Sequence, residues 1–156
     1  MAILLWLFVI NLGIAFGAGL YEHRIVVPRW IDTHWLAEVA RQDDTGRRFW
    51  AFVSTGPLTL LTLVNLVAAW RSVGAVRCWW LAAGLFALAD RLFTFAYFIP
   101  VMIGLMAAAD SPESVAAATR WSNLNYLRHA LVLTAWLAAL KTFAVFHQSR
   151  ASQLPG

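Results

Sequence analysis

The stretch CWWLAAGLFALADRLFTFAYFIPVMIGLMAAA, residues 78–109, decides the fold class of this chain. It is long enough to cross a bilayer, because a spanning helix needs roughly 20 mainly apolar residues. Its only charged residues are the neighbours Asp90 and Arg91, near its middle. A charge at that depth is costly against lipid, so such side chains normally face the interior of a helix bundle. The stretch therefore predicts a helical membrane protein with ions in its interior.

Three further apolar blocks accompany this one. The first, residues 2–20, is expected to remain helical to about Val27, because Pro28 follows. The second covers residues 49–70 without a charge, and the last starts between residues 115 and 124 and ends near residue 146. Four spans account for nearly the whole chain.

We therefore predict an all-α protein, an integral membrane four-helix transmembrane bundle formed by one domain over residues 1–148. A polar C-terminal tail follows at residues 149–156. In the long first loop, Ile31, Trp35 and Val39 recur at near-helical spacing. This spacing predicts an amphipathic segment that lies along the membrane surface.

The composition excludes several other classes of protein. Hydrophobic residues make up 61% of the chain and charged residues 13%, whereas a soluble domain is about 25% charged. The single cysteine, Cys78, excludes a disulfide-stapled scaffold. The arginines lie scattered beside apolar blocks and form no basic run, so we expect the lipid membrane and no nucleic acid as a partner.

The distribution of arginines also predicts the orientation. The short connection from Arg71 to Arg77 holds two arginines and no acid, which by the positive-inside rule makes it cytoplasmic. Both termini then lie in the cytoplasm, and we expect a bacterial inner membrane. The first loop opposes this assignment with five arginines, although five acidic residues accompany them.

Each apolar block carries one polar stripe when it is wound at 3.6 residues per turn. The stripes consist of Asn11 and Glu22 in the first block, Thr55, Thr59 and Thr62 in the second, Asp90, Thr94 and Tyr97 in the third, and Asn125, Arg128 and His129 in the last, with Trp121 one turn earlier. Lipid-facing positions do not hold such groups cheaply, so the four stripes are expected to enclose a polar cavity.

The charges expected inside the bundle balance. Asp90 is predicted to pair with Arg128 and Glu22 with Arg91, or the partners are exchanged. A purely structural network of ion pairs would explain the same residues. Intramembrane ionisable residues are nevertheless candidates for function by default.

Some polar and small residues have simpler interpretations. The threonines of the second block are expected to bond to the backbone of their own helix. Gly56 and Pro57 predict a kink in that block. The spacing of Gly13 and Gly17 is typical of helix packing.

Three short motifs resemble a known family. GAGLYEH at residues 17–23, FIPV at residues 98–101 and WSNLNYLR at residues 121–128 are similar to segments of the anthrone oxygenase-like family of small four-span membrane proteins. That family includes fungal enzymes to which the oxidation of an anthrone to an anthraquinone is ascribed. The family has a proline soon after its Glu-His pair, whereas here the proline is displaced to Pro28.

The resemblance implies an oxidoreductase, an oxygenase that acts on a flat, apolar, aromatic or quinone-like substrate from the bilayer without an obvious redox cofactor. The implied catalytic residues are His23 as general base, Arg128, or else Arg91, as the group that stabilises an enolate, and Glu22, or else Asp90, as an orienting group. The substrate-binding residues would be Asn125, Asp90, Arg91, Trp121 and Tyr97.

Two other functions remain open from the sequence. His23 and His129 would be the ligands of a bound haem or metal ion, in a haem- or quinone-binding membrane protein. A small transporter or an accessory subunit is the other alternative, and four spans would then require a homo-oligomer. No cofactor is expected for the oxygenase itself.

Overall fold

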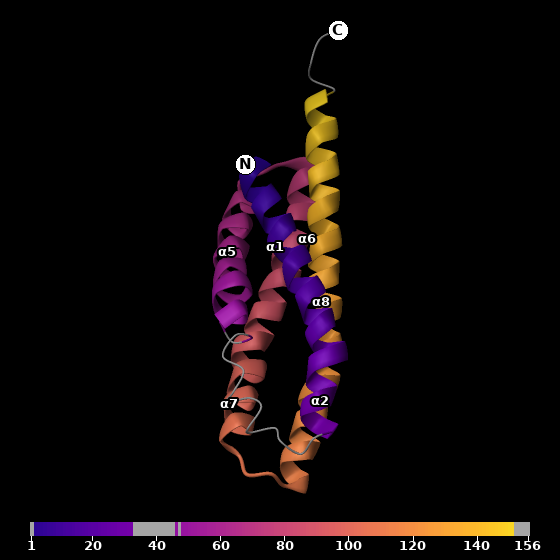
Figure 1. Cartoon of the computed structure of the whole chain (residues 1–156). Coiled ribbons are helices and arrows are strands. Elements are labelled where there is room, and N and C mark those ends of the chain that lie inside the picture. The colour runs from indigo at the N-terminus through magenta and orange to yellow at the C-terminus, as the bar shows by residue number, and fades with distance from the viewer. Residues whose placement is uncertain (1, 33–45, 47, 152–156) are drawn as a thin grey trace.

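The computed structural model describes residues 2–32, 46 and 48–151. Four long helical rods lie side by side (Figure 1). The elements, in chain order, are α1 (Ala2–Tyr21), the π-helix η1 (Glu22–Val26), α2 (Val27–Asp32), the π-helix η2 (Phe49–Thr55), α5 (Gly56–Trp70), α6 (Gly74–Phe93), the π-helix η3 (Thr94–Phe98), α7 (Ile99–Ala107) and α8 (Pro112–Ala151). The predicted all-α, four-helix class is confirmed.

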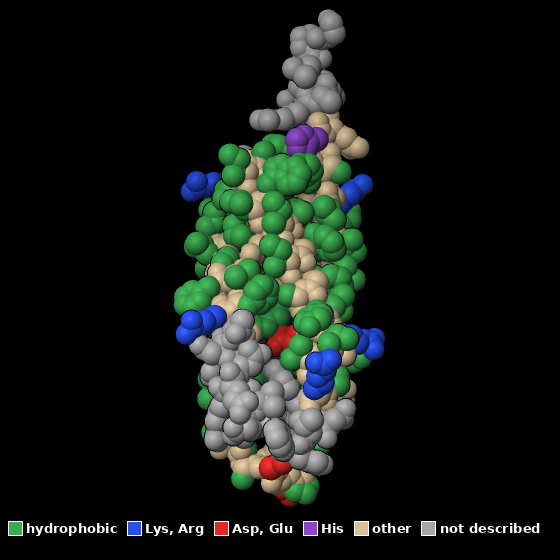
Figure 2. Space-filling model, viewed as in Figure 1, with side chains coloured by type: hydrophobic (Ala, Val, Ile, Leu, Met, Phe, Trp, Pro, Cys, Tyr) green, Lys and Arg blue, Asp and Glu red, His purple; other side chains and the backbone are tan. Residues whose placement is uncertain are grey.

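Four helices are long and apolar enough to cross a membrane, namely Ala2–Arg29, Phe49–Trp70, Gly74–Ala107 and Pro112–Gln148. Large apolar side chains cover the outside of the bundle, as expected where lipid is the solvent. Figure 2 shows this apolar surface between two levels of Lys and Arg side chains. The fold is therefore that of an integral membrane protein.

The predicted element boundaries need two adjustments. The first rod does not end at Pro28 but continues to Asp32, since a proline is tolerated in the first turn of α2. The last rod extends three residues into the predicted polar tail. The amphipathic segment predicted in the first loop falls mainly within residues 33–45, outside the described residues.

All three π-helices end two residues before a proline. Those prolines are Pro28, Pro57 and Pro100. A proline has no N–H for the carbonyl four residues earlier, and its ring collides with that carbonyl. A wider π turn relieves both problems and is a known cause of helix bending. The irregularity predicted at Gly56 and Pro57 therefore takes the form of a π-helix.

Asn11 compensates for one of these prolines. Its side-chain amide Nδ2 donates to the carbonyl oxygen of Val53 at 3.0 Å. Val53 lies four residues before Pro57, which has no N–H to offer that carbonyl. The one polar side chain in the middle of α1 thus joins the first two rods.

The rods pack in a closed cycle in which α1 contacts α5, α5 contacts α6, α6 contacts α8, and α8 contacts α1. The N-terminus of α1, the turn between α5 and α6 and the C-terminal end of α8 lie toward one end of the bundle, whereas α2 and α7 lie toward the other (Figure 1). A tight apolar core fills the first of these halves, with Leu5, Phe8, Leu12, Leu58 and Trp80 fully buried. A site for a small molecule must therefore lie in the other half.

The glycines of α1 do not act as one packing motif. A Cβ at Gly13 would lie 3.3 Å from the Trp136 ring of α8, so Gly13 does allow close packing. Gly17 is exposed, and a Cβ there would meet nothing within 4 Å. The prediction that Gly17 allows close packing of helices is therefore wrong for the helices of this chain.

Asn65 makes polar contacts inside the half of the bundle that is filled by the apolar core. Its Oδ1 accepts from Trp80 Nε1 at 3.0 Å, and its Nδ2 donates to the Leu61 carbonyl at 2.8 Å. The threonines near it behave as predicted, since Thr59 and Thr62 donate to the carbonyls four residues earlier in their own helix.

We predict that Asn65→Leu destabilises the protein in detergent by about 1–3 kcal/mol, because Trp80 Nε1 loses its acceptor inside an apolar core. Thermal unfolding followed by circular dichroism measures the effect. Asn123→Leu on the exposed side of α8 is the matched control and should leave the unfolding temperature within a degree or so of the wild type. Equal melting of Asn65→Leu and wild type would contradict the assigned contact.

Candidate functional site

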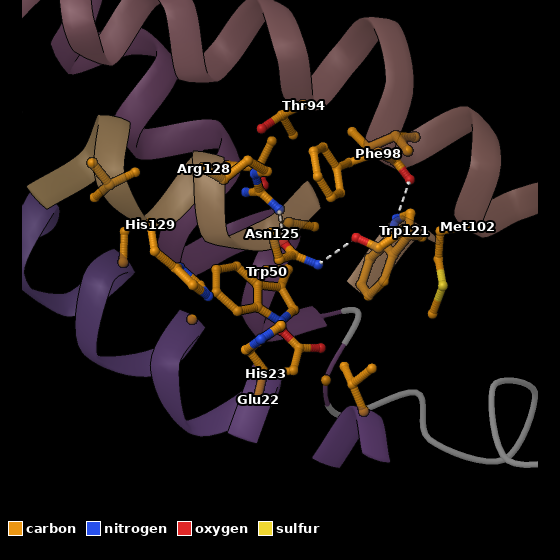
Figure 3. Close-up of a pocket in the computed structure, with 18 of the residues that line it drawn as sticks. Glu22, His23, Trp50, Thr94, Phe98, Met102, Trp121, Asn125, Arg128 and His129 are labelled. Atoms are coloured by element: carbon orange, nitrogen blue, oxygen red, sulfur yellow. Dashed lines mark hydrogen bonds between the residues drawn. The ribbon is translucent and has the colours of Figure 1, made fainter. Parts of the chain in front are cut away.

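A cavity of about 360 Å³ lies between the rods in the half of the bundle that contains α2 and α7. The three π-helices η1, η2 and η3 all contribute to its wall, together with α1, α7 and α8 (Figure 3). Its lining is mainly apolar, with a small set of polar side chains at one region. The polar residues that line it are Glu22, His23, Thr55, Arg91, Thr94, Trp121, Asn125, Arg128 and His129.

The structure brings together six of the eight residues that were assigned to catalysis or substrate binding from the sequence. Those that line the cavity are His23, Arg128, Glu22, Asn125, Arg91 and Trp121. Asp90 and Tyr97 do not line it. The cavity lies on the side of the first loop, since Gly46 and Trp50 belong to its wall.

Asp90 lies behind the cavity wall, where it is fully buried and bonds to two arginines. Its Oδ1 accepts from Arg128 Nε at 3.2 Å. Its Oδ2 accepts from Arg91 Nε at 3.0 Å and also from Arg91 Nη2. The predicted pairing of Asp90 with Arg128 is thus confirmed, and Arg91 shares the same carboxylate. Adjacent residues on a helix point in different directions, but the Arg91 side chain is long enough to bend back to Asp90.

This arrangement satisfies both oxygens of a fully buried carboxylate. Removing ions from water is expensive, and the expense is offset only when charge-assisted hydrogen bonds replace the lost hydration. Asp90 comes from α6 and Arg128 from α8, so the same bonds also fix these two helices against each other.

Tyr97 shows how the π-helix η3 alters the predicted face. On an ideal α-helix it would follow Asp90 and Thr94 along one stripe. In the structure it is stacked on Phe93 with ring centroids 5.6 Å apart, and Phe98 lines the cavity instead. The wider turn shifts the register by about one residue, which moves Tyr97 off the cavity face.

A chain of hydrogen bonds positions Arg128. Its Nη1 donates to Asn125 Oδ1 at 3.2 Å, and Asn125 Nδ2 donates to the Trp121 carbonyl at 3.3 Å. Trp121 Nε1 in turn donates to the Phe98 carbonyl at 3.1 Å. The Arg128 guanidinium also lies 4.5 Å from the centre of the Phe98 ring, a cation–π contact. These contacts, drawn in part in Figure 3, hold the guanidinium at the cavity wall.

Two histidines lie side by side at the cavity. The ring centroids of His23 and His129 are 5.3 Å apart, with the planes at 76°. His23 Nδ1 and His129 Nε2 are both buried without a hydrogen-bond partner within the described part of the chain. A Cβ at Gly19 would lie only 3.0 Å from His129 Cε1, so the absence of a side chain there allows the His129 ring its place. Unpartnered buried nitrogens at a cavity wall are available to a bound molecule.

Several residues of the site were not predicted from the sequence. Trp50 of η2, Phe98 of η3 and Met102 of α7 all line the cavity. The signal that could have found the first two is their position a few residues before Pro57 and Pro100, where the π turns form.

No group of three or more His, Cys, Asp or Glu side chains suited to a metal ion occurs among residues 2–32, 46 and 48–151. The two histidines that the sequence suggested as ligands of a metal or haem iron, His23 and His129, do lie close together.

No protein-family model, no curated protein and no solved structure matches this chain. What the structure establishes is therefore the class, a small protein with four candidate membrane spans and a cavity inside one half of its helical bundle.

We predict that Asp90→Asn is more destabilising than Arg128→Ala. Loss of the Asp90 charge leaves two buried guanidinium groups without their shared partner, at about 3–5 kcal/mol. Loss of Arg128 leaves Asp90 still bonded to Arg91, so the cost should be smaller. Thermal unfolding of the two variants in detergent measures which of them is less stable.

Arg120→Ala, at an exposed position on the same helix as Arg128, is the control and should melt like the wild type. If Asp90→Asn were as stable as the wild type, or less damaging than Arg128→Ala, the shared carboxylate would not have the role assigned to it.

Proposed function

We propose that this protein is a membrane-embedded oxidoreductase that resembles anthrone oxygenase and oxygenates a flat, apolar, aromatic or quinone-like molecule. The observation that carries the proposal is His23, a buried histidine with an unpartnered Nδ1 in a cavity that also presents the Arg128 guanidinium. A base and a cation at one apolar cavity suit the removal of a proton from carbon.

The lining of the cavity supports an aromatic substrate. The wall holds the rings of Trp50, Phe98 and Trp121 and the flexible side chains of Met102 and Met106. Aromatic and thioether groups favour the faces and edges of another ring. The surrounding rods are exposed to lipid, so an apolar molecule dissolved in the bilayer would be able to reach the cavity.

His23 is proposed as the general base. An imidazole ordinarily titrates near neutral pH and so can take up a proton and release it again. It removes a proton from an acidic C–H that is conjugated with the substrate carbonyl, and the electron pair moves to the carbonyl oxygen as an enolate. Arg128, held in place by Asn125, stabilises that negative charge. Glu22, beside His23 in the chain and at the same cavity, is proposed to orient the histidine.

The oxidant is molecular oxygen. The enolate carbon bonds to O₂, and the resulting peroxide takes up a proton and then loses water to leave a new carbonyl group. The balance is R₂CH₂ + O₂ → R₂C=O + H₂O, in which carbon is oxidised by four electrons and O₂ is reduced by four. The proton that His23 removes first is returned to the departing oxygen.

We further propose that the protein lies in a bacterial inner membrane with both termini in the cytoplasm. The N-terminus of α1, the C-terminal end of α8 and the arginine-containing turn between α5 and α6 lie toward the same end of the bundle (Figure 1), as this orientation requires. The cavity would then belong to the opposite half of the membrane. Assembly into a homo-oligomer is compatible with this placement.

A haem- or quinone-binding role is the second candidate function. It is favoured by the close approach of His23 and His129, whose buried unpartnered nitrogens are the atoms that would ligate a metal. An absorbance spectrum of the purified protein tests the haem form of this role, since a copurified haem gives a strong Soret band that a protein without haem lacks.

We predict that His23→Gln lowers the rate of oxygenation about 100- to 10,000-fold, because a glutamine amide cannot accept the substrate proton. The assay follows quinone formation by absorbance and oxygen uptake by electrode, with anthrone as the probe and its spontaneous oxidation subtracted. His147→Gln is the matched control, since His147 packs against Phe143 away from the cavity and should keep the wild-type rate.

A His23→Gln protein as active as the wild type would remove the base assignment. A wild-type protein that consumes no oxygen above the spontaneous rate would contradict the oxygenase proposal for this substrate class.

A further inference from the structure

Arg91 offers a hydrogen-bond donor for which the described part of the chain has no acceptor. The residue is only 3% exposed and lies at the cavity wall. Its Nε and Nη2 are bonded to Asp90, whereas Nη1 is buried and has no partner. An unsatisfied buried donor is costly, and a guanidinium remains charged at any ordinary pH.

The charges at this wall also favour an incoming anion. The single carboxylate of Asp90 bonds to both Arg91 and Arg128. Among the described residues, the other acid at the cavity is Glu22, which has interactions of its own, lies beside His23 in Figure 3 and also acts by its charge on Arg128. Asp90 already accepts from both guanidinium groups and leaves Arg91 Nη1 without a partner, so an incoming oxyanion would supply the missing acceptor.

We propose that the cavity binds an aromatic carboxylate, with a carboxylate oxygen accepting from Arg91 Nη1 and the flat ring against the apolar wall. This proposal rests on the proposed function in that it names the substrate class of the same site. A carboxylic acid is ionised at neutral pH and a simple phenol is not, since their ordinary pKa values are near 4 and 10. A carboxylate is therefore the oxyanion that arrives already charged, and its hydrogen bonds to a guanidinium are charge-assisted.

The polar and apolar parts of the wall suit the two parts of such a molecule. Phe98, whose ring lies against Arg128, and Met102 continue the wall toward α7. A ring placed against them would leave a reacting carbon within the same cavity as His23. Arg91 then anchors the substrate, while Arg128 stays available for the enolate.

The test measures binding and needs no turnover. Isothermal titration calorimetry of the full chain in detergent at pH 7 compares 2-naphthoate with 2-naphthamide, a neutral molecule of the same shape. We expect naphthoate to bind at least about 10-fold more tightly than the amide. Arg91→Gln should weaken naphthoate binding about 10- to 100-fold and leave naphthamide binding unchanged.

Two further variants make the result specific. Arg77→Gln, at the far end of α6 where its guanidinium lies over Trp70, is the control for loss of one positive charge and should bind both probes like the wild type. Arg91→Lys keeps the charge and should bind naphthoate better than Arg91→Gln does. If neither Arg91 variant folds, the affinities of the wild type for naphthoate and naphthamide still test the proposal.

Equal affinity of the wild type for naphthoate and naphthamide would overturn the proposal, as would an Arg91→Gln protein that binds naphthoate normally. Neither result would bear on His23 as the general base, which the oxygenation assay of His23→Gln tests separately. Conversely, selective naphthoate binding in a protein that shows no oxygenation would support the anion site and contradict the proposed function.

Discussion

The buried carboxylate of Asp90 is the group on which the functional half of the molecule depends. It comes from α6, bonds to Arg128 of α8 and to its neighbour Arg91, and has no access to water. Burying either charged guanidinium group inside an apolar bundle without such a partner would be strongly destabilising. The same contact that joins two helices therefore also keeps two guanidinium groups at the cavity wall, where a bound molecule can use them.

The second constraint is the backbone chemistry of proline. Pro28, Pro57 and Pro100 each lie two residues after the end of a π-helix, and the three π-helices contribute side chains to one cavity. Wider turns bend the rods and change which side chains face inward. In the other half of the bundle, where the helices are regular, the rods pack closely on residues such as Leu12 and Trp80. The cavity thus follows from where the prolines lie.

The sequence was sufficient for features that depend on composition and on charge. Four apolar blocks predicted the four spans, and the cost of a charge in lipid predicted that Asp90 would turn inward and pair with Arg128. It was not sufficient where the helical period changes. A constant period of 3.6 residues placed Tyr97 at the cavity instead of Phe98, because a π turn leaves no mark on hydrophobic periodicity. The inward position of Trp50 was missed for the same reason.

A double-mutant cycle on Asp90 and Arg128 tests most directly whether one carboxylate organises the site. The unfolding free energies of Asp90→Ala, Arg128→Ala and the double variant would be measured in the same detergent. The two side chains are bonded across α6 and α8 at 3.2 Å, which predicts a coupling energy of about 1–3 kcal/mol. Additive effects, with a coupling energy near zero, would mean that the two helices are held together without this ion pair and would contradict the account.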